Sequence, residues 1–401
     1  MMKVYQINVV CGTGSTGRIA VDLNRVICRE GGVCRIAYGR GIAPDGIDSF
    51  KIGNMRDLYF HAFMTRLTDR HGLYSGRKTR KLIADICSFA PDIIHLHNIH
   101  GYYVNYELLF QFLKVYGKPV IWTMHDCWAF TGHCAHYESV GCEQWREGCV
   151  NCANLNGYPA TWNSYHISGN YSRKKMCFSV MKRMVIVAPS EWLRNQLLCS
   201  FFKGIPCKVI NNGIDLEIYK YVHNDIKRRL GVGDRKLLLG VASVWTKNKG
   251  LLDMFTIATQ IDKKYVVCMV GVSKKQLKRM PAGIIGIERT ESSKELAQYY
   301  SAADVFLNLT YEDTFPTTNI ESLACGTPVV TYRTGGGSEI IDNTCGSIVK
   351  QGDIDGVINA IKQMEGRDFG SACREKALMY EKDLCYQQYL DLYMKVCKRE
   401  R

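Results

Sequence analysis

The sequence predicts an α/β protein of two domains, each built on a doubly wound parallel sheet with helices on both faces. Short apolar, strand-like runs alternate with helical stretches along the chain, which is typical of parallel sheets. This alternation occurs in two series. The 401 residues also exceed what one ordinary core organises, so two domains are expected.

Each series contains five predicted strands. The first consists of Val4–Val10, Val33–Tyr38, Ile93–Leu96, Val120–Thr123 and Val185–Ala188. The second consists of Val209–Ile210, Leu237–Val241, Val266–Val270, Val305–Leu309 and Val329–Tyr332. Helical pattern gives way to turn residues in Phe201–Gly213, which predicts domains at 1–205 and 206–384. The tyrosine-rich stretch Leu378–Lys395 predicts one long final helix.

The composition is that of a soluble globular protein, with 46% hydrophobic and 22% charged residues. No apolar run approaches the roughly 20 residues that span a bilayer. The first residues, MMKVYQINVV, lack the pattern of a signal peptide, so a cytosolic protein is expected. The eighteen cysteines are then expected to be reduced rather than paired in disulfides.

The net charge of +14 requires an anionic partner or surface. Basic residues interleave with apolar ones in a way that suits an anionic membrane face, although a solvated helix face is equally compatible. They cluster at Arg77–Lys81, at Arg173–Lys175 with Lys182 and Arg183, and at Lys395–Arg401. Nucleic acid is not an expected partner, because these residues are scattered and no recognition helix stands out.

The segment from residue 310 to residue 339 places two acids around the start of a predicted helix. Asp313 precedes the helix and Glu321 lies in its first turn. Its start consists of Thr317, Thr318 and Asn319, the last two being good caps. A helix start carries unpaired N–H groups and partial positive charge, so a diphosphate can bind there while carboxylates hold hydroxyl groups. A simple capping box, Thr318-x-x-Glu321, is the alternative, but it leaves Asp313 unexplained.

The two acids, with seven residues between them, resemble the signature of glycosyltransferase family 4, retaining enzymes of the GT-B fold. The resemblance implies two Rossmann-like domains facing a cleft and a helix at 385–401 crossing back to the first domain. It implies hexosyl transfer from a nucleotide diphosphate sugar to a glycan or lipid-linked acceptor in exopolysaccharide, capsule or O-antigen synthesis. Glu321 would bind the ribose hydroxyls and Asp313 a hydroxyl of the donor sugar.

Further positions match the family one by one. Lys249-Gly250 corresponds to a lysine that grips the donor diphosphate, while Val244 stands where the family usually has an arginine. Lys247 is the candidate for that second cation. His125 follows the strand Val120–Thr123, as does a family histidine that contacts the transferred sugar, and Arg194 corresponds to a candidate phosphate contact. The charge of the departing diphosphate is then met without a metal at the reaction centre.

The turn Cys11–Arg18 contains Gly12-x-Gly14-x-x-Gly17 between a strand and a helix. This is a dinucleotide fingerprint without its confirming acid, because the next strand ends at Arg40. The family resemblance places Gly14 beside the substrates instead. An NADP-linked reductase is one alternative function, although it leaves the second domain and the acid pair unused. A catalytically silent sugar-nucleotide-binding protein is another.

A cysteine-rich loop at 131–155 carries Cys134, Cys142, Cys149 and Cys152. A C-x2-C pair backed by two further cysteines suggests a structural zinc bound by four thiolates. Such an ion would stabilise an insertion that has little core of its own. Reduced cysteines packed within the loop are the alternative.

Overall fold

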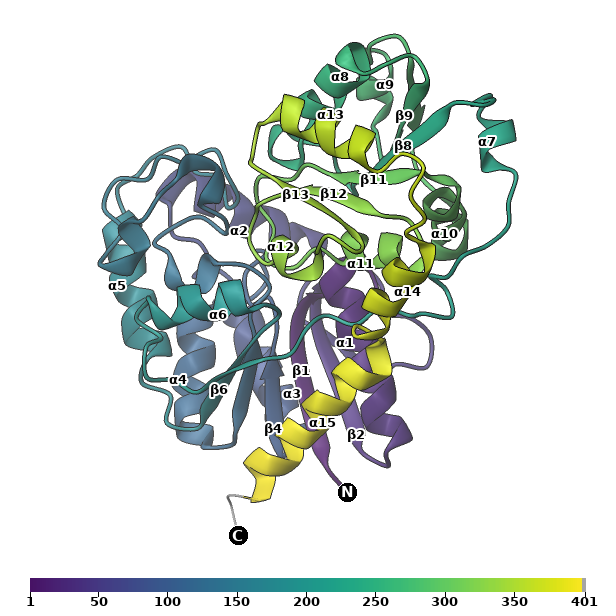
Figure 1. Ribbon diagram of the computed structural model, residues 1–401. Coiled ribbons are helices and arrows are strands. Elements are labelled where there is room, and N and C mark those ends of the chain that lie inside the picture. The colour runs from purple at the N-terminus through teal and green to yellow at the C-terminus, as the bar shows by residue number, and fades with distance from the viewer. Residues whose placement is uncertain (399–401) are drawn as a thin grey trace. The chain divides into compact units, whose positions relative to one another are not determined.

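The computed structural model describes residues 1–398 and divides into two units (Figure 1). The first unit contains Met1–Asn211 and the chain from Cys385, and the second contains Asn212–Leu384. Each is built on its own parallel sheet, so the predicted fold class is confirmed. Within the described residues, no helix combines the length and the apolar character needed to cross a bilayer.

The described residues of the first unit form a seven-stranded parallel sheet in the order β3-β2-β1-β4-β5-β6-β7. The strands are β1 Lys3–Val10, β2 Val33–Arg40, β3 Ser49–Lys51, β4 Ile93–Leu96, β5 Val120–Thr123, β6 Met184–Ala188 and β7 Cys207–Val209. The helices are α1 Gly14–Arg29, α2 Met55–Thr68, α3 Gly76–Phe89, α4 Tyr106–Tyr116, α5 Ile167–Phe178 and α6 Glu191–Leu198. The strand order reverses between β1 and β4, so ligands are expected at the loops after these strands.

Alternate residues of the central strands enter two different cores, as the two-residue period of a strand requires. Ile93 of β4 and Ile121 of β5 pack in the cluster that contains residues of α1 and the C-terminal helix. Their neighbours Ile94 and Trp122 pack in the cluster that contains residues of α3 and α4. Helices therefore cover both faces, and the strands read as continuous apolar runs because neither face meets water.

The described residues of the second unit form a six-stranded parallel sheet in the order β10-β9-β8-β11-β12-β13. The strands are β8 Lys236–Val241, β9 Tyr265–Val270, β10 Ile284–Ile287, β11 Val305–Asn308, β12 Val329–Tyr332 and β13 Gly346–Val349. The helices are α7 Ile226–Arg229, α8 Leu251–Gln260, α9 Lys274–Leu277, α10 Ser293–Ala302, α11 Thr317–Ala324, α12 Gly337–Ile340, α13 Ile354–Gln363 and α14 Gly370–Leu378. Here the order reverses between β8 and β11, which are followed by the segments that carry Lys249 and Asp313.

Two features of the predicted strands are wrong. The strand at Val209 was assigned to the second domain, but β7 pairs with β6 at Ile186↔Cys207 and so completes the first sheet. The division between units falls after Asn211, within the turn-rich segment 201–213. The edge strands β3, β10 and β13 were not predicted; each has only three or four residues, and Ser49–Lys51 also lacks an apolar run.

The final helix is interrupted, contrary to the single helix predicted for Leu378–Lys395. Helix α14 ends at Leu378, and α15 begins at Lys382 and runs to Lys398. Between them, the carbonyl oxygen of Tyr380 accepts a hydrogen bond from the Ile214 amide at 2.9 Å. The Lys382 amide in turn donates to the Ile214 carbonyl at 2.9 Å. An amide has a single hydrogen, so Lys382 does not bond the Leu378 carbonyl and continue α14, which accounts for the break. The last three residues of the predicted crossover helix, 399–401, lie outside the described residues.

Helix α15 lies against the first unit (Figure 1). It packs there through a row of buried tyrosines. The Tyr393 hydroxyl lies 2.6 Å from Nδ1 of His95, and the Tyr389 hydroxyl lies 3.1 Å from Oγ1 of Thr123. Oγ1 of Thr123 is also 2.8 Å from Nε2 of His95. These contacts satisfy the polar groups of two buried strands, so α15 is part of the folding unit and not an appended tail.

Replacing Tyr393 with Phe is expected to destabilise the first unit by about 1–3 kcal/mol, because it leaves a buried imidazole nitrogen of His95 without its partner. Urea denaturation followed by circular dichroism measures this loss. The matched change Tyr165→Phe, at a side chain that is 87% exposed, should have little effect. Equal stability of the two variants would contradict the structural role assigned to the contact.

Candidate active site

A close backbone approach in the second unit joins the loops after β8 and β11. Gly250 has φ +74°, and a Cβ atom there would lie 2.4 Å from the carbonyl oxygen of Leu309. Only glycine fits this position. The Tyr311 amide also donates to the Asn248 carbonyl at 2.8 Å. The turn that contains Lys249 is thereby held against the segment that contains Asp313.

Lys249 and Asp313 form an ion pair at this junction. Lys249 Nζ lies 2.9 Å from Asp313 Oδ2 and donates to the carbonyl of Glu312 at 3.2 Å. The other carboxylate oxygen of Asp313 accepts from the Phe315 amide at 3.2 Å. The two side chains are 39% and 25% exposed, so both remain accessible to a ligand. An ammonium group has three donors, and these two contacts leave one for a further acceptor.

The start of α11 differs from the prediction. Its N-cap is Pro316, and no side chain of the described residues caps it, so the predicted caps Thr318 and Asn319 and the capping box are wrong. Glu321 lies beyond the first turn and is nearly buried; it accepts from the Tyr300 hydroxyl at 3.0 Å and from Thr317 Oγ1 at 3.4 Å. Burial, reinforced by the charge of Glu321, raises the pKa of Tyr300 well above 10, so Tyr300 stays a donor. Because no described side chain caps α11, the amides of Thr317 and Thr318 are open to an anion, whereas the Asn319 amide donates to the Pro316 carbonyl at 3.2 Å.

A buried amide adds another donor at this helix start. Asn319 Oδ1 accepts from Asn308 Nδ2 at 2.7 Å, whereas Asn319 Nδ2 has no acceptor among residues 1–398. A Cβ atom at Gly337 would lie 3.2 Å from Pro316 Cγ and 3.9 Å from Asn319 Nδ2. Gly337 thus packs closely over the start of α11, where a side chain would not fit without a shift of Pro316. An oxygen-rich ligand there would satisfy the unpaired amide.

Lys247 is exposed in the short helical turn that also contains Lys249, and Val244 in the preceding loop is exposed as well. Thr318 is half-buried at the start of α11. Arg194, on α6 of the first unit, pairs with Glu191 Oε2 at 2.8 Å. The phosphate-binding roles of Lys247 and Arg194 therefore stay predictions.

A cavity of about 640 Å³ in the second unit lies elsewhere. Its lining includes Lys236, Asp304 and Pro328, which stand at or just before the amino ends of β8, β11 and β12. Ligands of doubly wound sheets bind at the carboxyl ends of the strands. This cavity is therefore not the candidate active site.

In the first unit, a chain of hydrogen bonds runs from the middle of β1 to the carboxyl ends of β4 and β5. Gln6 Oε1 lies 2.9 Å from His97 Nε2, and His97 Nδ1 lies 3.1 Å from His125 Nε2. The rings of His97 and His125 are stacked, with centroids 5.4 Å apart. Sequence reasoning singled out His125 but missed His97, although the pattern His95-x-His97 at a strand end was an available signal.

These imidazoles are neutral at physiological pH. Burial lowers the pKa of His125 to about 4, against the opposing charge of Asp126. Burial and the neighbouring histidines hold the pKa of His97 well below 6.5. Because Gln6 Oε1 accepts from His97 Nε2, the neutral His97 accepts at Nδ1 from His125 Nε2. His125 can therefore accept a hydrogen bond from a sugar hydroxyl at Nδ1, but it cannot donate one there or serve as a cation.

Asp126, beside His125, is tied to the scaffold. Its Oδ2 lies 2.7 Å from His100 Nε2, and its Oδ1 accepts from the Trp128 amide at 2.9 Å. Burial alone would raise the pKa of Asp126, but His100 and the backbone donor lower it to about 2. Both oxygens thus orient the loop after β5 and so hold His125 in place.

The glycines of the N-terminal turn have separate causes. A Cβ atom at Gly12 would lie 2.4 Å from Pro44 Cγ, and one at Gly17 would lie 3.0 Å from Val10 Cγ2, so packing accounts for both. Gly14 opens α1 with φ +65°, and no described heavy atom lies within 4 Å of a Cβ built there. Of the three, only Gly14 leaves room for a ligand beside the backbone.

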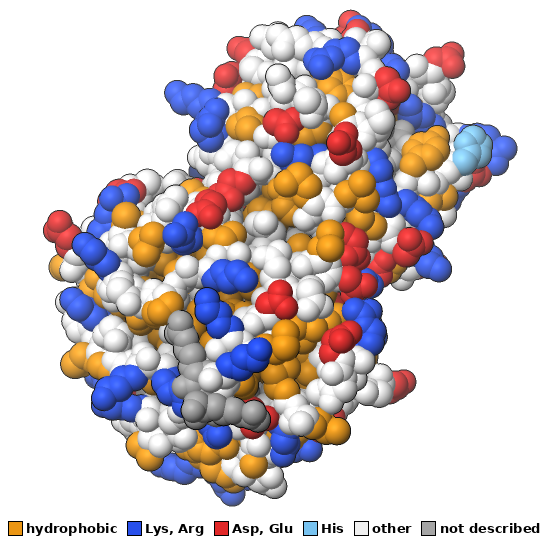
Figure 2. All heavy atoms as spheres, turned by 60° about the horizontal axis from the view of Figure 1, so that its bottom comes forward, with side chains coloured by type: hydrophobic (Ala, Val, Ile, Leu, Met, Phe, Trp, Pro, Cys, Tyr) orange, Lys and Arg blue, Asp and Glu red, His pale blue; other side chains and the backbone are white. Residues whose placement is uncertain are grey.

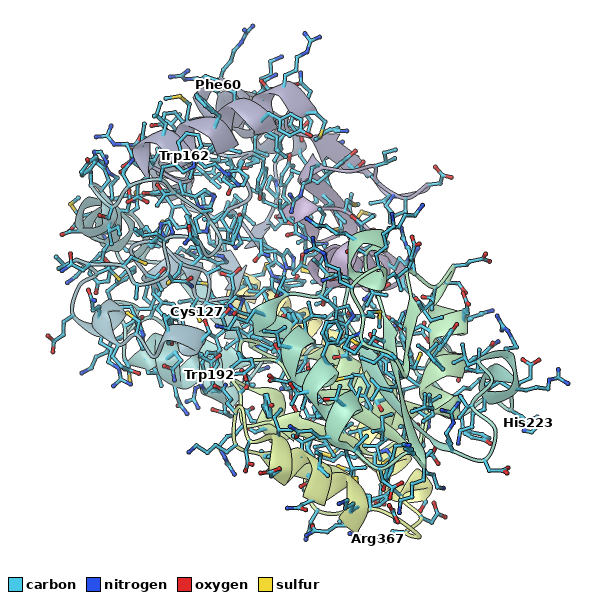
Figure 3. The ribbon with its side chains drawn as sticks, turned by 90° about the horizontal axis from the view of Figure 1, so that it is seen from above. Phe60, Cys127, Trp162, Trp192, His223 and Arg367 are labelled. Carbon is cyan, nitrogen blue, oxygen red and sulfur yellow. The ribbon has the colours of Figure 1, made fainter. Side chains whose placement is uncertain are left out.

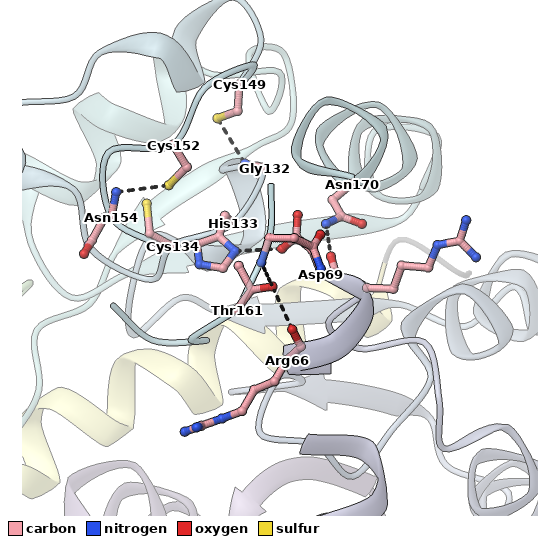
Figure 4. A network of polar contacts seen from close by, with 12 residues as sticks. Arg66, Asp69, Gly132, His133, Cys134, Cys149, Cys152, Asn154, Thr161 and Asn170 are labelled. Carbon is pink, nitrogen blue, oxygen red and sulfur yellow. Dashed lines mark hydrogen bonds and ion pairs between the residues drawn. The ribbon is translucent and has the colours of Figure 1, made fainter. Parts of the chain in front are cut away.

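The cysteine-rich loop gathers its four predicted thiols around one small cavity. Cys134, Cys142, Cys149 and Cys152 all line a space of about 20 Å³. Cys149 Sγ accepts from the Gly132 amide at 3.1 Å, and Cys152 Sγ from the Asn154 amide at 3.4 Å (Figure 4). The hydrogen bond between Cys134 and Cys152 lowers the pKa of the Cys152 thiol and raises that of Cys134. Over residues 1–398, however, no three His, Cys, Asp or Glu side chains are already placed to hold a metal ion.

A buried lysine lies beneath this loop. Lys174 Nζ donates to the carbonyl oxygens of Trp128 at 2.7 Å and Thr131 at 3.0 Å. Burial lowers the pKa of Lys174 to about 7, although Cys149 and Cys134 oppose the shift. Arg173 pairs with Glu107 at 3.1 Å. Of the predicted basic cluster at Arg173–Lys175 with Lys182 and Arg183, Lys174 is buried and cannot face a membrane, and the membrane role of the other four cations stays a prediction.

Two family models match the chain. One, described as Glycosyltransferase Family 4, covers residues 40–218, and one described as Glycosyl transferases group 1 covers residues 235–365. The chain belongs to glycosyltransferase family 4. It is 23% identical over 411 residues to WcaC of Escherichia coli (strain K12), named as a colanic acid biosynthesis glycosyl transferase, and 98% of each chain is covered. The oxidoreductase alternative is thereby set aside.

Solved structures place this glycosyltransferase in the GT-B fold. Sucrose-phosphate synthase from Thermosynechococcus elongatus superposes with a TM-score of 0.73 at 16% identity, over 99% of both chains. Anabaena HepE in complex with UDP-glucose superposes with a TM-score of 0.68 at 14% identity, over 98% of this chain and 100% of the other. At these identities the likeness establishes the fold alone.

The buried histidines are expected to make the first unit acid-sensitive. Burial lowers the pKa of His95 to about 3 and of His125 to about 4, whereas each titrates near 6.5 when unfolded. As the pH falls below 6.5, the unfolded chain binds protons that the native state excludes. Each imidazole then removes about 1.4 kcal/mol of unfolding free energy per pH unit, down to its folded pKa.

Urea denaturation at pH 7 and pH 5 measures this change in unfolding free energy. His97→Gln should lower the number of protons taken up on unfolding by one, because burial also holds the pKa of His97 well below 6.5. Equal stability at the two pH values, or an unchanged number of protons in the variant, would show that these histidines are not held neutral.

Proposed function

We propose that this glycosyltransferase is a retaining enzyme that moves a hexosyl group from a nucleotide diphosphate sugar to an acceptor hydroxyl. The observation that carries the proposal is the ion pair between Lys249 and Asp313. Asp313 lies just before the start of α11, which has no cap among the described side chains and carries the buried, unpaired side-chain amide of Asn319. These groups suit a ligand that combines diphosphate with hydroxyls. Retention of the anomeric configuration is inferred from the family 4 signature.

The diphosphate would bind at the start of α11. The first-turn amides of Thr317 and Thr318 and the side-chain Nδ2 of Asn319 supply neutral donors, and Lys249 supplies a cation. Charge that grows on the departing diphosphate would be stabilised by groups already in place. Lys247, exposed on the same turn, is the candidate for the cation that Val244 cannot provide. This arrangement requires no metal at the reaction centre.

The two carboxylates would take the hydroxyl groups of the donor. Glu321 already accepts from two hydroxyls, and its long contact with Thr317 is the one that a ribose hydroxyl would replace. A phosphate oxygen would compete with Asp313 for Lys249, which frees Asp313 to accept from a hydroxyl of the donor sugar. Donor binding and release of Asp313 are then a single exchange of charge partners.

His125 would position the transferred sugar from the first unit. As a neutral imidazole anchored through His97 to Gln6, it offers a hydrogen bond of fixed direction without adding charge. Gly14, with open space beside its backbone, permits a sugar to approach α1 closely. Both residues follow strands at or beside the switch point of the first sheet.

The acceptor would be a glycan or lipid-linked oligosaccharide of a surface polysaccharide, such as an exopolysaccharide, a capsule or an O-antigen. Support comes from WcaC, which is named for colanic acid biosynthesis and aligns over nearly the whole chain. A nucleotide-sugar donor is supported by HepE, whose structure contains UDP-glucose.

Lys249→Ala is expected to lower kcat/KM for transfer by about 100- to 1000-fold, because it removes the cation that stabilises the leaving diphosphate. Lys247→Ala on the same turn is the matched control and should cost less. Glu321→Gln should mainly raise KM for the donor. A thermal-shift screen with UDP-, GDP- and ADP-sugars selects the donor before the kinetic comparison.

Equal turnover by the wild type, Lys249→Ala and Glu321→Gln would place the active site elsewhere. Donor stabilisation with neither transfer nor donor hydrolysis in the wild type would favour a catalytically silent sugar-nucleotide-binding protein.

We also propose that the four loop cysteines bind one structural zinc ion. Support comes from the number and softness of the sulfur donors, the shared cavity, and the backbone amides that donate to Cys149 and Cys152. The thiol side chains would have to rotate toward the cavity to become ligands. The buried ammonium of Lys174 would offset part of the negative charge of four thiolates.

Elemental analysis of the purified protein is expected to find about one zinc per chain. Cys152→Ser should lose this zinc and lower the melting temperature, because metal binding and folding of the loop are coupled. Cys199→Ser, at an exposed cysteine outside the loop, is the matched control. Wild type free of zinc after expression in zinc-supplemented medium would leave the thiols as packed, reduced side chains.

A further inference from the structure

Helix α2 of the first unit presents its apolar side chains to solvent. Tyr59, Phe60, Phe63 and Leu67 are 66%, 58%, 53% and 49% exposed. At about 100° per residue, these four and Met55 occupy one continuous face roughly 140° wide. A helix that covers a core normally turns such a face inward.

The inward side of α2 is instead largely polar. His61 and Thr65 are fully buried, and their polar atoms are satisfied locally. His61 Nδ1 lies 2.7 Å from Ser75 Oγ, its Nε2 accepts from the Gly72 amide at 3.1 Å, and Thr65 Oγ1 donates to the His61 carbonyl at 2.9 Å. The helix is thus fixed to the unit by hydrogen bonds, and packing does not account for its outer aromatic residues.

A neighbouring loop extends the same apolar surface. The Trp162 amide donates to the Arg66 carbonyl at 2.9 Å, and Asn163 Nδ2 donates to the Leu67 carbonyl at 2.7 Å. The Trp162 ring meets Phe63 edge to face at 6.1 Å and is 64% exposed. Figure 3 shows Trp162 beside the helix that carries Phe60. Tyr165, three residues on, is 87% exposed.

The charge around these residues is positive. Residues 54–81 contain seven Lys and Arg against two Asp. Arg56 and Arg66 lie on the outer face of α2, whereas Asp57 is paired with Lys78 at 2.9 Å and Asp69 is buried. Elsewhere the pattern differs: on the face in Figure 2, Lys and Arg side chains are spread among acidic and apolar ones.

We propose that this surface, formed by Tyr59, Phe60, Phe63, Leu67, Trp162 and Tyr165 with Arg56 and Arg66, docks on an anionic lipid bilayer. Aromatic rings and arginine side chains on one helix face are what the headgroup region of such a bilayer accommodates. The arginines would contact lipid phosphates while the rings enter the boundary with the acyl chains. The proposal places the bilayer contact at α2 and not at the basic cluster around Arg173–Lys175, and it keeps Arg77–Lys81, which lies in α3 next along the chain.

Flotation with vesicles of phosphatidylcholine containing one third phosphatidylglycerol tests the surface. The wild type is expected to float at low salt and to bind pure phosphatidylcholine much less. Phe60→Ser/Phe63→Ser should lower the vesicle partition coefficient at least about tenfold, because binding scales with buried apolar area. The matched control is Val115→Ser/Tyr221→Ser, at side chains that are 87% and 66% exposed elsewhere on the chain.

Trp162 supplies a second measurement, because Trp192 is half-buried and Trp122, Trp128, Trp145 and Trp245 are buried. Brominated lipid should quench a component of the tryptophan emission that Trp162→Phe removes. An unchanged partition coefficient in the Phe60/Phe63 variant, or quenching unaffected by Trp162→Phe, would overturn the proposal. So would a change in oligomeric state of that variant without vesicle binding by the wild type.

These readouts need no sugar transfer, so they are separate from the proposed function. Thermal shift by the nucleotide sugar, measured without vesicles, should be the same in the wild type and the surface variants. A variant that loses vesicle binding but keeps the thermal shift by the nucleotide sugar tests the surface alone. Absence of that thermal shift in the wild type would count only against the proposed function.

Discussion

The reversal of strand order in each parallel sheet is the constraint on which the candidate site residues of each unit depend. In the second sheet it places the end of β8 beside the end of β11, and the loops that leave these strands must diverge around a shared opening. Gly250 then lets one loop approach the Leu309 carbonyl closely enough for Lys249 to reach Asp313. Without that approach, Lys249 and Asp313 would be too far apart to form an ion pair.

The same topology in the first sheet has a different chemical result. There His97 and His125, which follow β4 and β5, form a hydrogen-bonded chain with Gln6 of β1, and α15 supplies Tyr393 to the adjacent His95. Burial keeps these imidazoles neutral, so the first unit offers directional hydrogen bonds where the second offers charge.

In helix α2, the face that carries the apolar residues is not the face that is buried. Its apolar residues have the spacing of a core-facing stripe, yet the buried side consists of His61, Thr65 and Leu58. The unit has its cores against the sheet, and α2 is held to it mainly by hydrogen bonds. The aromatic residues on the outer face of α2 are therefore exposed and accessible to a binding partner.

Much of the fold and part of the site followed from the sequence. The alternation of apolar runs and helices determined two parallel-sheet units, since strands buried on both faces must be continuously apolar. The spacing of Asp313 and Glu321, with Lys249-Gly250 and His125 after predicted strands, determined the candidate ligand groups, because turn and strand-end positions are local properties.

Tertiary structure alone decided the rest. It assigned β7 to the first sheet, interrupted the final helix at Tyr380, gave Glu321 the hydroxyls of Tyr300 and Thr317 in place of a cap, and brought His97 to His125. It also buried Lys174 and exposed Phe60 and Phe63. Each of these depends on which distant segment lies next to a residue, and that neighbour sets both its hydrogen-bond partners and its access to water.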